Sequence, residues 1–132
     1  MHTALVPQNK RSRFLAKHFG RPLFDLVVFN IADSMLKGYT GGYWNYFEAE
    51  DGVAFLALAG SSNVTLKNIF SGEEVEVDNL LAGMILTSFA LLSQIENDGC
   101  DRYYSLHGRL NDAIAQYCSE IGRLDAWMTL MD

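Results

Sequence analysis

The stretch DNLLAGMILTSFALLSQIE, residues 78–96, decides the fold of this chain of 132 residues. Asp78 is a good N-cap, so we predict a helix from Asn79 to about Glu96. Apolar residues recur around this helix at Leu80, Leu81, Met84, Ile85, Phe89, Leu91, Leu92 and Ile95. A helix so apolar must be largely enclosed by the rest of the protein. Its apolar run, residues 80–92, is too short to span a bilayer, which predicts a core helix and no membrane partner.

Three strands are predicted before this helix, over residues 43–48, 53–59 and 64–70, with a short extended piece at 74–77. Each run is short and contains aromatic or β-branched residues. Turn residues separate the runs, with Asp51-Gly52 in the first gap and residues 60–63 in the second. This spacing favours a short antiparallel β-meander.

Helical periodicity is expected on both sides of the strands. Residues 12–18 and 23–37 precede them; residues 101–117, with a possible break at Gly108, and residues 119–131 follow. Helices segregated from an antiparallel sheet indicate an α+β fold. We therefore expect residues 13–132 to form a compact single domain in which the helices before and after the meander pack on one face.

Charge divides the chain unequally. Residues 1–21 carry five of the ten basic residues and no acid, a charge of +5, whereas residues 22–132 carry all 16 acids and a charge of −11. Residues 1–12 are predicted to be a flexible basic N-terminal arm, either solvated or in contact with an acidic partner or nucleic acid. The acidic remainder argues against strong duplex DNA binding, because it repels phosphates.

The two cysteines, Cys100 and Cys118, do not form a metal-binding pair, and no apolar leader segment is found at the N-terminus. We expect free thiols, a cytoplasmic location and a monomer.

Motifs for nucleotide binding, metal binding or nucleophilic catalysis are absent from the sequence. His18 and His107 are isolated. The acids of residues 48–51 lie at the tip of the first predicted hairpin, where carboxylates are usually solvated, and those of residues 73–78 precede the core helix, which Asp78 caps. We therefore predict no catalytic residue, no metal and no cofactor. Sixteen acids interspersed with ten bases also make extended DNA mimicry the less favoured interpretation.

The densest aromatic segment supplies a candidate partner-binding surface. Strand alternation puts Trp44 and Tyr46 on one face of the sheet and Tyr43 on the other. If rings are exposed here, they would be good interface anchors beside acids at the strand's far end. The candidates are Tyr43, Trp44, Tyr46, Glu48, Glu50 and Asp51. The alternative is that these rings belong to the core.

Several segments resemble the ArdB/KlcA antirestriction family. They are His18-Phe19-Gly20, the run YTGGYWNYF at residues 39–47, Gly52-Val53-Ala54-Phe55, Phe70-Ser71-Gly72-Glu73 and Asp101-Arg102-Tyr103. The resemblance implies a compact α+β protein of a plasmid, phage or other mobile genetic element. It also implies relief of type I DNA restriction in the host cell, with a type I restriction enzyme or an associated host factor as the partner. A small enzyme or accessory protein of a mobile element with an unrecognised site is the alternative.

Overall fold

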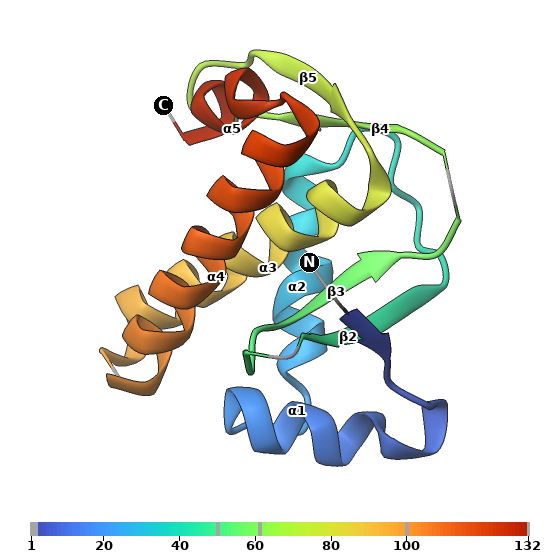
Figure 1. The fold of residues 1–132 in the computed structure, drawn as a ribbon, viewed down its shortest axis with the longest axis vertical. Helices are drawn as coiled ribbons and strands as arrows, with labels where there is room; N and C mark the ends of the chain where they lie inside the picture. The colour runs from blue at the N-terminus through green and yellow to red at the C-terminus, as the bar shows by residue number, and fades with distance from the viewer. Residues whose placement is uncertain (1–2, 50, 61, 100, 132) are drawn as a thin grey trace.

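The computed structural model describes residues 3–49, 51–60, 62–99 and 101–131. Its strands are β1 (Thr3–Leu5), β2 (Trp44–Ala49), β3 (Ala54–Leu58), β4 (Val64–Lys67) and β5 (Glu74–Val77). Its helices are the 3-10 turn η1 (Gln8–Lys10), α1 (Arg11–Phe19), α2 (Phe24–Met35), α3 (Asn79–Asp98), α4 (Asp101–Ile121) and α5 (Leu124–Met131). This arrangement confirms the predicted α+β class (Figure 1).

Helix α3 is the core helix that the sequence predicts. The Asp78 carboxylate accepts a hydrogen bond from the Leu81 amide at 2.7 Å and thereby caps the first turn. Leu81, Met84 and Ile85 are completely buried. By length and composition alone, residues Asn79–Asn97 would suffice to cross a membrane, but 67% of that window is buried inside the protein.

Helix α3 packs on β3 with unusually little space between the backbones. A Cβ atom placed on Gly83 would lie 2.3 Å from the Ala57 Cβ and 2.3 Å from the Leu56 carbonyl oxygen. One turn further on, the Thr87 hydroxyl donates to the Gly83 carbonyl at 2.8 Å and accepts from the Leu56 amide at 3.1 Å. Gly83 therefore permits the approach, and Thr87 satisfies a strand amide that would otherwise be buried without a partner.

The strands form two antiparallel sheets where the sequence predicted one meander. Strands β1, β2 and β3 make one sheet in that order, and β4 pairs with β5 in the other. The chain turns away after β3 at Gly60, whose φ of +119° suits glycine. Strand β4 then lies beside the end of α2, where the Lys37 amide donates to the Thr65 carbonyl at 3.0 Å.

The N-terminal segment differs from the predicted flexible arm. Thr3 pairs with Ala49 and Leu5 with Phe47, so β1 extends the first sheet. The Val6 amide donates to the Tyr46 carbonyl at 2.8 Å, and α1 begins at Arg11. Three residues are too few to show a strand period, and the hydrogen bonds to β2 come from a distant part of the chain.

The C-terminal helices also differ in detail from prediction. Helix α4 continues through Gly108 to Ile121, and α5 begins at Leu124. The break falls at Gly122, where φ is +70°. Strand β4 ends at Lys67 because the buried Asn68 side chain starts a turn: its Oδ1 accepts from the amide of Phe70 at 2.9 Å.

We predict opposite effects from the same substitution in two helices. Gly83→Ala should lower the free energy of unfolding by about 1–3 kcal/mol, because the added methyl group overlaps β3. Gly108→Ala, in open space on α4, should raise it by up to about 1 kcal/mol through helix propensity. Chemical denaturation of the two variants tests this. A Gly83→Ala protein as stable as Gly108→Ala would contradict the close packing of α3 on β3.

Candidate functional site

The six candidate residues do not share one surface. Trp44 and Tyr46 lie on the same face of β2, as alternation predicted, and their exposed fractions are 4% and 5%. Tyr43, just before the strand, is 63% exposed. Glu48 is half-buried and Asp51 is exposed in the β2–β3 turn. Glu50 lies outside the described residues.

The Trp44 ring belongs to the core. It packs against Phe29 with ring centroids 5.1 Å apart, and its Nε1 donates a hydrogen bond to the Tyr39 hydroxyl at 3.2 Å. The condition for Trp44 or Tyr46 to act as an exposed anchor is therefore not met, and the core alternative is the observed one. These two rings can influence a surface only by positioning its backbone and its neighbouring side chains.

Tyr46 organises a polar cluster beneath that surface. Its hydroxyl donates to the Asp25 carboxylate on α2 at 2.7 Å, and the Arg11 guanidinium lies 4.4 Å from its ring centroid. Arg11 also donates to the Trp44 carbonyl at 3.1 Å. Burial, reinforced by the hydrogen bond and negative charge of Asp25, raises the pKa of Tyr46 well above its usual range. The cluster joins α1, α2 and β2.

The part of this region that a partner can reach is a shallow hollow of about 210 Å³. Its lining consists of Arg11, Phe29, Gly42, Tyr43, Trp44 and Tyr46. Tyr43 contributes the exposed ring, and the Arg11 guanidinium lies 5.7 Å from that ring's centroid. Sequence reasoning missed Arg11 and Asp25, since a basic terminal residue and an acid on a helix surface carry no local signal for such a cluster.

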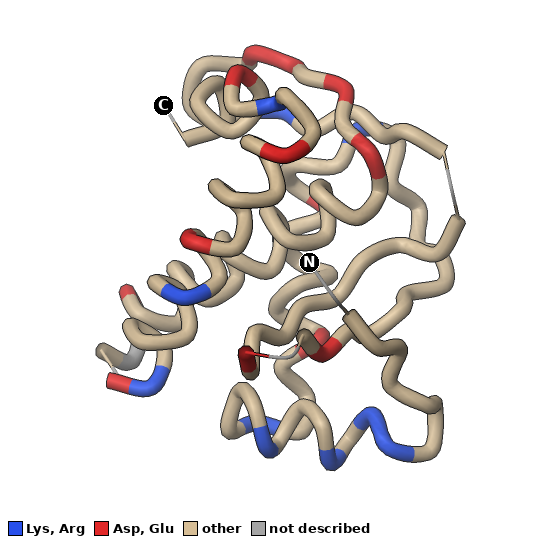
Figure 2. The backbone as a smooth tube through the Cα atoms, in the orientation of Figure 1, with Lys and Arg blue, Asp and Glu red and all other residues tan. Residues whose placement is uncertain are grey.

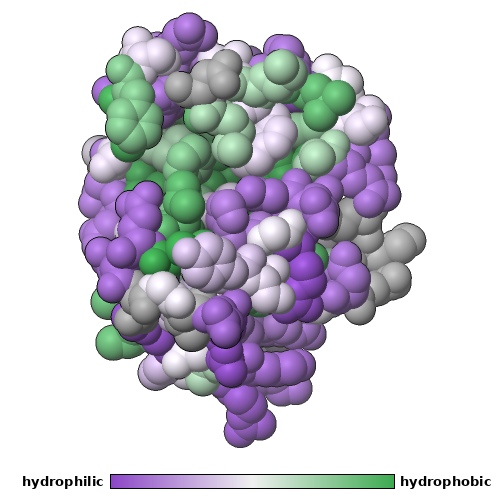
Figure 3. Space-filling view, turned by 90° about the vertical axis from the view of Figure 1, so that its left-hand side faces the viewer, coloured by the Kyte–Doolittle hydropathy of each residue, from purple (hydrophilic) through white to green (hydrophobic). Residues whose placement is uncertain are grey.

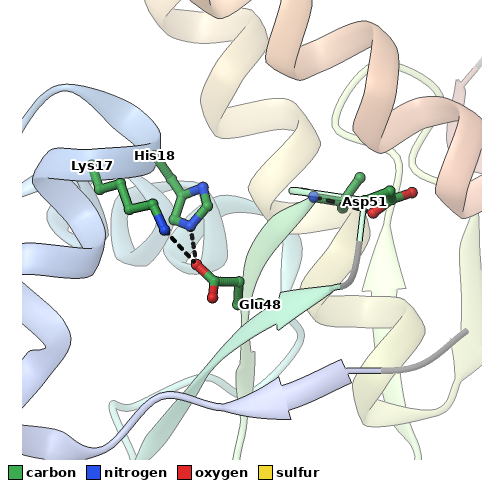
Figure 4. A network of polar contacts seen from close by, with 5 residues as sticks. Lys17, His18, Glu48 and Asp51 are labelled. Atoms are coloured by element: carbon green, nitrogen blue, oxygen red, sulfur yellow. Dashed lines mark hydrogen bonds and ion pairs between the residues drawn. The ribbon is translucent and has the colours of Figure 1, made fainter.

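Glu48 points toward α1 and not toward the β2–β3 turn (Figure 4). Its Oε2 is hydrogen-bonded to His18 Nε2, and the Lys17 Nζ lies 3.6 Å from the same oxygen. The hydrogen bond from His18 is the main cause that lowers the pKa of Glu48, and Lys17 adds to it. Asp51 is turned away from this network and accepts from the Val53 amide at 3.2 Å. The acids predicted to lie together at the far end of β2 are therefore divided between two environments.

Burial shifts the pKa values of three other titratable groups. The Tyr117 hydroxyl donates to Asp78 at 3.3 Å, and burial raises the pKa of Tyr117 to about 12. Burial also raises the pKa of the Cys118 thiol, while Cys100 lies outside the described residues. Burial lowers the pKa of His107, which contacts Asn111 at 3.4 Å. Within the described ranges, no group of three or more His, Cys, Asp or Glu residues is arranged to hold a metal.

Comparison with known proteins identifies the class of this chain. The model of the family described as "Antirestriction protein" matches residues 37–123, which run from the end of α2 to just beyond α4. Because this match covers more than half of the chain, the protein belongs to the antirestriction protein family. The prediction of the family from the run YTGGYWNYF and its companion segments is confirmed.

Two relatives extend the comparison beyond the family segment. The uncharacterized protein YafX of Escherichia coli (strain K12) is 25% identical over 118 residues, which cover 85% of this chain and 78% of that protein. A solved structure has a TM-score of 0.72 at 24% identity and covers 98% of this chain and 92% of its own. That structure comes from work on the KlcA and ArdB proteins, which are described as showing a novel fold and antirestriction activity against type I DNA restriction systems in vivo but not in vitro. The likeness establishes a shared fold.

Replacing Trp44 should show whether the aromatic segment acts through stability. Trp44→Ala should lose about 3–5 kcal/mol of unfolding free energy, because a large core side chain is removed. Tyr43→Ala, one residue earlier and exposed, should change it by no more than about 0.5 kcal/mol. Thermal and urea denaturation measure both. Equal stabilities for the two variants would show that Trp44 is not in the core.

The Glu48–His18 contact should make stability depend on pH. The lowered pKa of Glu48 means that its contribution is complete above the ordinary value of 4.5 and is lost as pH falls through the folded-state value. Glu48→Gln should therefore be less stable than wild type at pH 7, by about 0.5–1 kcal/mol for so exposed a pair, and the difference should shrink in acid. Urea denaturation between pH 7 and pH 3 measures this. Glu96→Gln is the control and should show no such convergence.

Proposed function

We propose that this protein relieves type I DNA restriction in the cytoplasm of its host cell by binding another protein, and that it is not an enzyme. The match of its fold over 98% of the chain to the structure from the KlcA and ArdB work carries the proposal. Membership of the antirestriction family supports it independently.

The polar chemistry of the molecule favours contact over catalysis. His18 and Glu48 are bonded to each other, and Tyr46 and Asp25 form a second internal pair. These two pairs hold α1 and α2 on the sheet. Binding a partner protein through an exposed surface needs no free acid or base.

Either the type I restriction enzyme or an associated host factor could be the partner. Antirestriction activity seen in vivo but not in vitro, as described for the KlcA and ArdB proteins, supports the involvement of a component that only the cell supplies. A pull-down with this protein from restricting cells, and from cells of the same strain without the restriction genes, separates the two partners. Recovery of the same host protein from both strains would favour the host factor.

Among the six candidates, Tyr43 and Asp51 are retained as partner contacts because both are exposed. Tyr43 presents its ring beside the Arg11 guanidinium at the hollow, an arrangement suited to a partially apolar partner. Trp44 and Tyr46 position this surface from below, and Glu48 holds α1 against it.

A plating assay tests the function directly. Unmodified phage should plate more efficiently on a restricting host that expresses this protein than on the same host without it. Tyr43→Ala should weaken the relief at unchanged melting temperature, because it removes a ring without touching the core. Tyr104→Ala, which removes an exposed tyrosine on α4, is the matched control and should leave the relief intact.

Two results would contradict the proposal. Absence of relief by the folded wild-type protein against type I systems would remove the function. Complete loss of relief in a stably folded His107→Ala or Cys118→Ala variant would instead indicate catalysis.

A further inference from the structure

Helix α5 is apolar on two sides. Ala126 and Leu130 face the interior and are buried. Leu124, Met128 and Met131 follow the spacing i, i+4, i+7, which puts them on one outward face, and Met128 is 65% exposed. A surface helix normally has a polar outer face. The outer face of α5 therefore has the composition of a contact surface.

Exposed apolar residues from two other segments, the turn after β4 and the end of α4 at Ile121, adjoin this face. The turn after β4 carries Ile69 and Phe70, and the Phe70 side chain is 85% exposed. The buried Asn68 anchors that turn to α5, since its Nδ2 donates to the Thr129 carbonyl at 3.0 Å. The resulting α5 patch consists of Ile69, Phe70, Ile121, Leu124, Met128 and Met131. Figure 3 shows apolar surface gathered in the upper part of this side of the molecule, where α5 lies.

Acidic residues surround the α5 patch. Glu73 and Glu74 follow the turn that carries Phe70, and Glu120 and Asp125 flank the junction of α4 with α5. We call these four exposed residues the acidic rim; they lie at the end of the molecule opposite α1 (Figure 2). Lys37 pairs with Glu74 at 3.1 Å and Arg123 with Asp125 at 3.3 Å. The patch thus combines apolar contact area with an excess of negative charge.

We propose that the α5 patch binds an amphipathic helix of a partner protein, with the helix's apolar side chains on the patch and its Lys or Arg residues on the acidic rim. The outer stripe from Leu124 to Met131 spans eight residues, a rise of about 10 Å, which matches two turns of a bound helix. Met128 and Met131 are unbranched and can adapt to varied apolar side chains. Recognition of an amphipathic helix by a partner surface uses anchors at helical spacing.

The negative charge of the acidic rim favours a basic helix over a membrane, a nucleic acid or a second copy of this chain on the α5 patch. Lys37 and Arg123 offset two of the four carboxylates, and the net negative charge that remains would repel an anionic membrane surface or a nucleic acid. A second copy bound patch to patch would bring two acidic rims together, at a cost of like-charge repulsion. A basic amphipathic helix satisfies both features of the surface. This inference is independent of restriction relief, and its test does not use restriction.

The test uses a fluorescent 14-residue peptide of leucine and lysine in an amphipathic pattern, and fluorescence anisotropy of the full-length protein. Wild type should bind this peptide and should not bind the equivalent leucine–glutamate peptide. Met128→Asp should weaken binding about tenfold, the value of one buried apolar side chain. Because Asp adds a negative charge, purely electrostatic binding would become tighter instead. Leu26→Asp is the matched control: Leu26 is also an exposed apolar residue, at 52% against 65% for Met128, but lies in the first turn of α2.

Charge reversal provides the second arm of the test. Glu73→Lys should weaken binding of the lysine peptide, whereas Glu96→Lys, on the last turns of α3, should not. The proposal is overturned if wild type binds neither peptide or both equally, or if Met128→Asp binds as well as Leu26→Asp. Binding of wild type to phosphatidylserine vesicles through the patch, or dimerisation that Met128→Asp abolishes, would equally overturn it in favour of a membrane or a second copy.

Discussion

The close approach of α3 to β3 at Gly83 is the constraint on which the rest of the structure depends. A side chain at this position would collide with Leu56 and Ala57, so the helix axis and the strand are held nearer than side-chain packing usually allows. The Thr87 hydroxyl on α3 accepts a hydrogen bond from the Leu56 amide on β3. Because one side of α3 packs closely on β3, its other sides can pack against α2 and α4. The same helix also contacts β4, so it touches both sheets and two of the surrounding helices.

A second constraint acts at the N-terminal end. The Arg11 guanidinium covers the Tyr46 ring and donates a hydrogen bond to the Trp44 carbonyl. The Tyr46 hydroxyl in turn donates to the Asp25 carboxylate on α2. These contacts bury a strand whose aromatic composition otherwise suits an exposed interface. The same helix α1 supplies His18 and Lys17 to Glu48. The basic segment is consequently part of the folded structure, and it covers the aromatic strand.

How much the sequence predicts depends on whether the deciding interaction is local. Asp78 as a cap and the apolar residues of α3 are local signals, and the helix was predicted within two residues of its observed end. Alternation correctly grouped Trp44 with Tyr46, but whether that face is covered depends on α1 and α2, which the strand's own residues do not encode. The pairing of Thr3 with Ala49 is likewise a long-range contact without a local pattern. The sequence thus predicted the strand and which of its rings share a face, and it left open whether that face is exposed.

The arrangement of charge explains why the net value of −6 describes the molecule poorly. The basic residues of α1 lie at one end of the molecule. Arg102, at the start of α4, adds to them: its guanidinium lies beside Gly20 at the end of α1, where an added Cβ would be 2.8 Å from it. The acidic rim lies at the other end. Arg102 and Glu120 are separated along α4 by 18 residues, about 27 Å, whereas physiological salt screens charges beyond about 8 Å. An approaching protein therefore meets mainly basic residues at the α1 end and an excess of acidic residues at the other end. Because the acidic end also exposes the apolar side chains of the α5 patch, attraction there can be followed by burial. At the α1 end, the rings of Trp44 and Tyr46 are already used inside the protein, and a partner meets basic charge, the exposed Tyr43 ring and the separate exposed side chains of Leu5 and Leu23.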